Sequence, residues 1–270
     1  MKKASTAVNL TVDNDEARGQ VLRYPTRLSA GGDEMDEARV AEVAFAPDAG
    51  GAALEEQPSE VLRPELVPEI RRFAPSPVVE AGARYLFELI PRLHDDASLA
   101  EALAAARHAL EAYVDLANLE LPVSRLADTE AFRLFAAEVL RRREELWAAY
   151  NASLAEYRRA YRERSPAQPV PDLARDGPRL ELPLWVWRAG QPRRHLWAEL
   201  LTDGGLALFA NSEPVGRVAA ADLATADATA ARLAALRQEG WKVRPRALTM
   251  TLFVRLAVGD AFIHGLGGAL

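Results

Sequence analysis

The chain contains no cysteine among its 270 residues. This absence excludes disulfide bonds, thiolate zinc sites and a cysteine nucleophile supplied by this chain. Histidine is scarce, with 4 residues, and no two of them have the His-X-X-X-His spacing of a helical zinc site. A chain without cysteine is compatible with the cytoplasm, which is where we expect this protein to be located.

The sequence also lacks an excess of positive charge. It has 33 Lys and Arg residues against 39 Asp and Glu residues, which gives a formal net charge of -6. The basic runs LRRREEL and EYRRAYRERS are interleaved with glutamate, which is typical of a solvated helix face. We therefore expect no nucleic-acid partner.

No apolar run predicts a membrane span. The best candidate, ALTMTLFVRLAVGDAFIHGL, holds Arg255, Asp260 and His264, each of which is costly in lipid. The run MKKASTAVNLTVDND holds Asn9 and Thr11 and no convincing cleavage site, which favours a strand over a secretory signal. The chain starts almost directly on this strand and stops in a glycine-rich turn, GLGGAL. This suggests a fragment that lacks parts at both ends.

The remaining composition is that of a globular protein. Hydrophobic residues are 49% and charged residues 27% of a chain long enough for one or two domains. Alternating apolar residues predict strands at 5–12, 21–28 and 38–45. A helix is predicted over 76–93, after irregular chain rich in Pro and Gly. Residues 1–77 are thus expected to form an N-terminal α/β portion.

Two long helices are predicted next and together define a helical arm over 78–165. The first covers 98–119, where Ser98 and Glu101 form a capping box. The second is capped by Asp128 and runs to about residue 164. We expect them to pack as an antiparallel pair, like a helical hairpin or a coiled-coil arm, which could also associate in a homodimer. The second helix carries an apolar stripe of Phe132, Phe135, Val139, Leu146, Tyr150, Leu154, Tyr157 and Tyr161.

A proline-rich linker over 166–183 leads into the last predicted region, 184–270, which we expect to pack with the N-terminal portion. LPLWVWRA, RHLWAELL and LALFAN read as a β-meander, with TDGG as a tight turn. Trp185 and Trp187 share one face of the first strand, which could be covered on both sides. Helices are predicted over 221–239, ending at Gly240, and over 247–263. The whole pattern predicts an α/β protein.

The acidic tip after the first strand, Asp13-Asn14-Asp15, is the first candidate site. Ligands of open α/β sheets bind at the carboxyl ends of strands. Two carboxylates one residue apart could hold a divalent metal that bridges phosphates, as in nucleotide-sugar glycosyltransferases. Ala17 argues against a haloacid-dehalogenase phosphatase, which needs Thr or Val there. The alternative is a turn that only ends the strand.

Cationic side chains form the second candidate. Arg244 and Arg246, in KVRPRAL, precede the last predicted helix and could bind phosphate or carboxylate bidentately. Arg255 lies within the apolar helix, where a buried ion pair or an anion site would explain it.

The glycine-rich end is the third candidate. In HGLGG, the backbone N–H groups around Gly265, Gly267 and Gly268 could hold an anion, although a helix C-cap explains Gly265 as well. Asp260 and His264 are four residues apart and would share a helix face, as an acid–base pair or as a structural polar pair.

Two of these stretches, in this order, resemble segments of the bacillithiol-biosynthesis cysteine-adding enzyme family. AVNLTVDND is similar to its strand with an acidic tip, and RPRALTMTLFVRLAVGDAFIHGLGGAL to its Arg-Pro run, apolar helix and glycine pair. The resemblance covers about a fifth of the chain and lacks the family's upstream glycine/glutamine motif. It implies a Rossmann-like core, incomplete here, with an appended coiled coil, beside the small β-meander that the strand pattern predicts.

The resemblance also implies a site and a reaction, the joining of cysteine to glucosaminyl-malate. The catalytic residues would be Asp13, Asp15 and His264. The substrate-binding residues would be Asn14, Arg244, Arg246, Asp260, Gly265, Gly267 and Gly268.

We therefore expect a ligase or transferase for a small polar substrate, amino-sugar-like or nucleotide-bearing, with a divalent metal or a nucleotide as the conceivable cofactor. A metal-dependent nucleotide-sugar glycosyltransferase and a non-enzymatic scaffold that associates through its helical arm are the alternatives.

Overall fold

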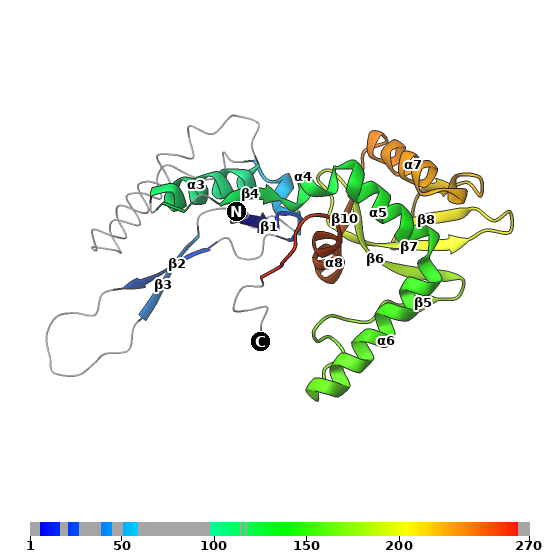
Figure 1. Ribbon diagram of the computed structural model, residues 1–270, viewed down its shortest axis with the longest axis horizontal. Helices are drawn as coiled ribbons and strands as arrows, with labels where there is room; N and C mark the ends of the chain where they lie inside the picture. Colours follow the sequence, from blue (N-terminus) through cyan, green and yellow to red (C-terminus); the bar gives the residue numbers. More distant parts are fainter. Residues whose placement is uncertain are drawn as a thin grey trace, which may run out of the picture. The chain divides into compact units, whose positions relative to one another are not determined.

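The computed structural model describes residues 6–16, 21–26, 39–44, 51–58, 98–113, 115–116 and 118–263. The chain divides into two compact units, Met1–Arg125 and Leu126–Leu270, and each is described by itself. Both units contain helices and strands, so the protein is of mixed α/β type (Figure 1). The sequence predicted finer boundaries near residues 77, 165 and 183, and these stay a prediction, as does a Rossmann-like core.

The first unit contains a parallel strand pair. β1 (Val8–Thr11) pairs with β4 (Leu119–Pro122), and Val8 lies opposite Leu119. The unit also contains an antiparallel pair, β2 (Val21–Thr26) with β3 (Arg39–Ala44), and a short 3₁₀ helix, η1 (Leu54–Glu56). The three strands predicted in this unit are confirmed with slightly shorter bounds, whereas β4 was not predicted.

Helix α3 (Leu99–Tyr113) begins at the predicted capping box. The Ser98 amide donates to the Glu101 carboxylate, and the Glu101 amide donates to the Ser98 hydroxyl, each over 3.3 Å. The helix was predicted to reach residue 119, which is wrong. Asp115 takes a left-handed φ of +60°, which closes the helix, and β4 begins four residues later.

The second unit is built on one antiparallel sheet. Its strand order is β10-β6-β7-β8-β9, and the short β5 pairs with β6. β6, β7 and β8 confirm the predicted meander, and Gly204, with φ of +80°, forms the predicted turn between β7 and β8. β9 and β10 were not predicted. The strands are β5 (Arg175–Asp176), β6 (Arg179–Arg188), β7 (Arg194–Leu200), β8 (Leu206–Ala210), β9 (Glu213–Val218) and β10 (Trp241–Pro245).

One face of this sheet is mostly apolar and carries many of the unit's buried side chains. Its side chains alternate along each strand with those of the other face, as period-two geometry requires. The other face carries Trp185 and Trp187, of which Trp187 is fully buried and Trp185 half-buried, so β6 is covered on both sides as predicted. The buried apolar residues are Leu182, Leu184, Val186, Leu196, Leu206 and Leu208.

The helix predicted from Asp128 to about residue 164 is two helices. α5 (Glu130–Arg141) and α6 (Arg143–Tyr161) are separated by Arg142, whose φ and ψ of -103° and 24° are not helical. The cap is Thr129 rather than Asp128, because the Thr129 hydroxyl accepts the Phe132 amide over 3.2 Å. A short helix, α4 (Val123–Ala127), precedes them across the boundary of the two units.

The predicted helical hairpin or coiled-coil arm is not confirmed. α3 belongs to the first unit, whereas α5 and α6 belong to the second. Part of the apolar stripe packs inside the second unit, since Phe132 and Phe135 lie 5.3 and 5.2 Å from the ring of Phe253. A homodimer through the arm stays a prediction, with fewer stripe residues available to it.

The proline-rich linker lies against α6. The guanidinium of Arg158 donates to the carbonyls of Pro166, Gln168 and Val170 over 2.8–2.9 Å, and to the carboxylate of Asp172 over 2.7 Å. These contacts hold the segment as an ordered strap between α6 and the sheet, rather than as a free linker.

Two helices complete the unit. η4 (Asp222–Ala224) leads into α7 (Ala226–Gln238), and Gly240 follows with φ of +91°, which confirms its predicted role at this helix end. α8 (Ala247–Ala257) ends six residues before the predicted Ile263. Arg255 is exposed and donates to the carbonyls of Gly259 and Asp260, so a buried ion pair does not explain it, and the alternative of an anion site stays a prediction. Among the described residues, no helix is long and apolar enough to cross a membrane.

Candidate functional site

The first predicted site residue, Asp13, lies at the carboxyl end of β1, as expected, but it has a structural partner. It is fully buried, and its Oδ1 accepts the Ser124 amide over 2.8 Å, while its Oδ2 accepts the Ser124 hydroxyl. Its own carbonyl accepts the Glu55 amide over 2.8 Å. Because Ser124 follows β4, Asp13 joins the ends of the two parallel strands at the start of α4.

The other residues of the acidic tip differ in their surroundings. Asn14 is buried, whereas Asp15 is exposed and its carboxylate accepts the Glu16 amide over 2.9 Å. In the described part of the chain, no group of three or more His, Cys, Asp and Glu side chains is placed to hold a metal ion. The hydrogen bonds of Asp13 support a strand-end anchor, and its predicted catalytic role stays a prediction.

We expect Asp13→Ala to lower the free energy of unfolding by roughly 1.5–3 kcal/mol, because it removes the charged acceptor of two Ser124 hydrogen bonds. Asp15→Ala is the matched control, and this exposed change is expected to stay within about 0.5 kcal/mol. Urea unfolding of both variants measures the difference. An Asp13→Ala chain as stable as the control would point away from the anchor and toward the predicted catalytic role.

A second polar group covers one face of the β1–β4 pair. Glu120 of β4 accepts from Asn9 over 2.9 Å, from Thr11 over 3.2 Å and from the Arg107 Nε over 3.1 Å. Burial opposes ionisation of Glu120, but these hydrogen bonds and the Arg107 charge outweigh it and hold its pKa below the ordinary value. All these groups have partners, so the cluster ties α3 to the sheet.

Arg244 and Arg246 lie on the side of the sheet that carries the two tryptophans, and each has its own carboxylate. Arg244 of β10 donates to Asp128 over 2.9 Å. Arg246, which precedes α8, donates to Glu181. Their guanidinium carbons lie 6.0 Å from the ring of Trp187 and 5.1 Å from the ring of Trp185, respectively. The two predicted substrate-binding arginines therefore form an alternating ladder with the two tryptophans.

Glu181 is the centre of a group of interacting charged side chains in this unit. It lies in β6, and its Oε1 is 2.8 Å from His195 Nδ1 and also accepts from Arg246 Nη1. Its Oε2 accepts the Ala174 amide over 2.9 Å. The side chains of Glu181 and Arg246 are 5% and 9% exposed, whereas that of His195 is 37% exposed. The imidazole is therefore the one member of this group that solvent reaches readily.

A bulge in β6 lies next to this contact. β6 and β7 pair at Glu181 with Trp197 and again at Trp185 with His195, and the register shifts between these pairs. Pro183 lies in the shifted stretch and has no N–H for the ladder. The strand pairing places Glu181, Trp185 and His195 on one face of the sheet, and the ring centre of His195 lies 4.8 Å from that of Trp185.

The electrostatics keep Glu181 charged. Burial alone would raise the pKa of Glu181, but the hydrogen bonds from His195 and from the Ala174 amide oppose it. With the charges of His195 and Arg246, they hold this pKa below its ordinary value. Tyr150 of α6 lies near the same charges, and burial with the Glu181 charge raises its pKa against the opposing effect of Arg246.

This arrangement can transfer a proton. A carboxylate that accepts from Nδ1 fixes the tautomer in which Nδ1 carries the hydrogen, so Nε2 is left as a proton acceptor. Arg193 also lies over Trp185, with its guanidinium carbon 4.7 Å from the ring centre. The cluster thus joins an oriented imidazole to arginines that suit an anionic group. A carboxyl group whose pKa is shifted by charged partners, beside an accessible imidazole, is typical of functional sites.

Of the residues in this cluster, only Arg246 was predicted as a site residue. Glu181 and His195 were not predicted, and Tyr150 was predicted only as part of the apolar stripe. The available signal was weak, since RRHLW places a lone histidine in a polar position of an alternating strand. The pairing of His195 with Glu181 becomes visible only when β6 and β7 are paired.

The remaining predicted residues lie near the end of the chain. Asp260 is exposed and follows α8, so the expectation that it shares a helix face with His264 is wrong, because α8 ends at Ala257. His264, Gly265, Gly267 and Gly268 lie outside the described residues. Asp13, Asn14 and Asp15 belong to the first unit, and Arg244, Arg246 and Asp260 belong to the second. Their expected meeting at one site stays a prediction.

Comparisons with known proteins add no relative. No protein-family model, no curated protein and no solved structure matches this chain.

Proposed function

We propose that the chain is a ligase or transferase that acts on a small polar, anionic substrate at the Glu181–His195–Arg246 cluster. His195 would transfer the proton, Glu181 would orient its imidazole, and Arg246 would hold the carboxylate in place and favour an anionic group nearby. The observation that carries the proposal is the buried Glu181 carboxylate, which accepts hydrogen bonds from both His195 and Arg246 while the imidazole alone stays accessible.

The reaction class is supported by chemistry and by the sequence resemblance. An amine or hydroxyl nucleophile loses a proton as it forms a new bond, and a neutral imidazole with a fixed Nδ1–H accepts such a proton through Nε2. The resemblance to the cysteine-adding enzyme family supplies the substrate class, an amino-sugar-like or nucleotide-bearing molecule. The absence of cysteine is compatible with a cytoplasmic location.

The two alternative functions have less support. A metal-dependent glycosyltransferase needs the Asp13 carboxylate as a ligand, and both of its oxygens accept hydrogen bonds from Ser124. A scaffold that pairs through its helical arm needs the stripe of α5 and α6, and Phe132 already packs on Phe253.

The test is a thermal melt of the whole chain with ATP, UDP-N-acetylglucosamine, glucosaminyl-malate or cysteine, each with and without manganese. A ligand that binds only the folded chain raises the midpoint, and a concentration of 100 times Kd adds about 2.7 kcal/mol. We expect one anionic ligand to raise it, and His195→Gln and Arg246→Gln to reduce that rise. A cooperative melt that none of these ligands moves would count against the enzyme and favour the scaffold.

A further inference from the structure

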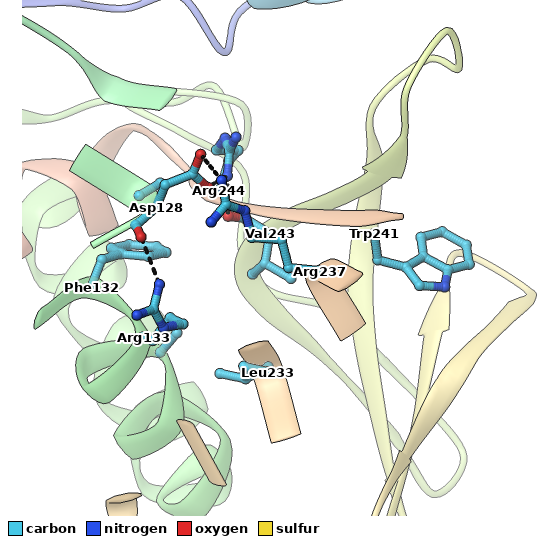
Figure 2. A pocket seen from close by; sticks show the side chains of 10 residues that line it. Asp128, Phe132, Arg133, Leu233, Arg237, Trp241, Val243 and Arg244 are labelled. Carbon is cyan, nitrogen blue, oxygen red and sulfur yellow. Dashed lines mark hydrogen bonds and ion pairs between the residues drawn. The ribbon is translucent and has the colours of Figure 1, made fainter. Parts of the chain in front are cut away.

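A second group of charges in the Leu126–Leu270 unit surrounds Asp128, apart from the Glu181 cluster (Figure 2). Its Oδ1 accepts from Arg244 Nη1 and its Oδ2 from Arg237 Nη2, each over 2.9 Å. Its backbone carbonyl accepts from Arg133 Nη1 over 2.6 Å. Three guanidinium groups from α5, α7 and β10 therefore meet at one aspartate.

These groups line a cleft with an apolar floor. Figure 2 shows Asp128 bonded to Arg244 on one side and to Arg133 below it, with Phe132 next to Arg133 and Leu233 further down. Phe132 and Leu233 are buried, and Ala136 and Val243 complete the apolar part. An apolar floor weakens competition from water and strengthens the interaction of a guanidinium with an anion.

Arg133 and Arg237 each donate only one N–H group to Asp128. Arg133 donates to a neutral carbonyl, that of Asp128, and among the described residues no carboxylate forms an ion pair with it. Arg237 gives one N–H to Asp128, and its side chain is 56% exposed. Each guanidinium has five N–H donors in a planar fork, so both keep donors that can reach an anion in the cleft.

We propose that this cleft is a binding site for a small phosphate or carboxylate group, held by Arg133 and Arg237, with Asp128 as an internal competitor. The amino end of α5, capped by Thr129 at the edge of the cleft, adds a favourable partial charge. The Asp128 carboxylate occupies the donors that an incoming anion would use, and it repels that anion. The site is independent of the proposed function, because none of its residues belongs to the Glu181 cluster.

The test is calorimetric titration of the whole chain with inorganic phosphate and, in a second arm, with malonate, both at a constant ionic strength set by sodium chloride. Arg133→Gln and Arg237→Gln are each expected to weaken binding about tenfold, since each removes a charged donor pair. Asp128→Asn is expected to strengthen binding about tenfold, because it removes the nearby negative charge. Tighter binding of phosphate or of malonate names the group that the site prefers.

Arg159→Gln, at an exposed arginine of α6, is the matched control and should leave the affinity unchanged. Arg237→Lys is a second variant in case Arg237→Gln folds poorly, and it should keep the charge but lose part of the affinity. Equal loss in the control, or binding that none of the cleft variants changes, would overturn the site. Weaker binding in Asp128→Asn would overturn the competitor role.

Discussion

His195→Gln is expected to lower turnover roughly 10²–10⁴-fold, the range that a general acid–base group contributes. Glutamine keeps an amide that can donate to Glu181, but it offers no basic nitrogen to accept a proton. The side chain is 37% exposed, so its replacement should change the melting midpoint little. The measurement is kcat and KM with the ligand that stabilises the chain, beside a melt of the same variant.

His108→Gln is the matched control, since His108 is an exposed histidine on α3 of the first unit. A loss confined to His195→Gln, with KM nearly constant, supports proton transfer, because it removes an interaction made in the transition state. Equal kcat values in the two variants would show that His195 is a structural partner of Glu181 and nothing more.

The strands and helices that carry a strong local pattern were predicted correctly. β7 alternates apolar and polar residues, β6 and β8 contain short continuous apolar runs, and the capping box at Ser98 is a local feature of four residues. β10 was not predicted, because its alternation of apolar and polar residues covers only Trp241 to Arg244 and the strand then ends in Pro245. The break at Arg142 was missed as well, since one non-helical residue barely alters a helical period.

The candidate site was predicted only in part, because the partners of its residues lie far from them along the chain. Arg246 stands out in the sequence, but its partner Glu181 lies 65 residues earlier. Asp13 stands out too, but Ser124, which gives it a structural role, lies 111 residues later. Local patterns report residue types and spacing, whereas a side chain's partners depend on strand pairing.

Arginine and tryptophan side chains alternate on one side of the sheet in the second unit. This arrangement connects the Glu181 cluster with the charges around Asp128. A guanidinium stacked on an indole is held in place while its N–H donors stay available at its edge. Arg244 pairs with the half-buried carboxylate of Asp128, and Arg246 pairs with the buried carboxylate of Glu181. Rigid arginines of this kind lose little conformational entropy when an anion binds, which suits a site for small charged molecules.

Glu181→Gln is expected to lower the free energy of unfolding by roughly 3–5 kcal/mol, because it leaves the charge of Arg246 buried with no opposite charge. Arg246 is 9% exposed, so water cannot replace the lost carboxylate. Glu199→Gln is the matched control, since Glu199 pairs with Arg179 at 2.9 Å on the same sheet with both side chains a quarter to a third exposed. That pair should contribute less than about 1 kcal/mol.

The loss of stability caused by Glu181→Gln should also depend on pH, because the pKa of Glu181 lies below its ordinary value of 4.5 in the folded chain. A carboxyl group with a lowered pKa stabilises the fold fully above the pKa of the unfolded chain, and this contribution disappears as the pH falls through the folded pKa. Urea unfolding of the natural chain and of Glu181→Gln should therefore differ by a constant amount near neutral pH and converge below about pH 4.5. A difference that stays constant into strong acid would show that Glu181 stabilises the sheet through packing instead of through its charge.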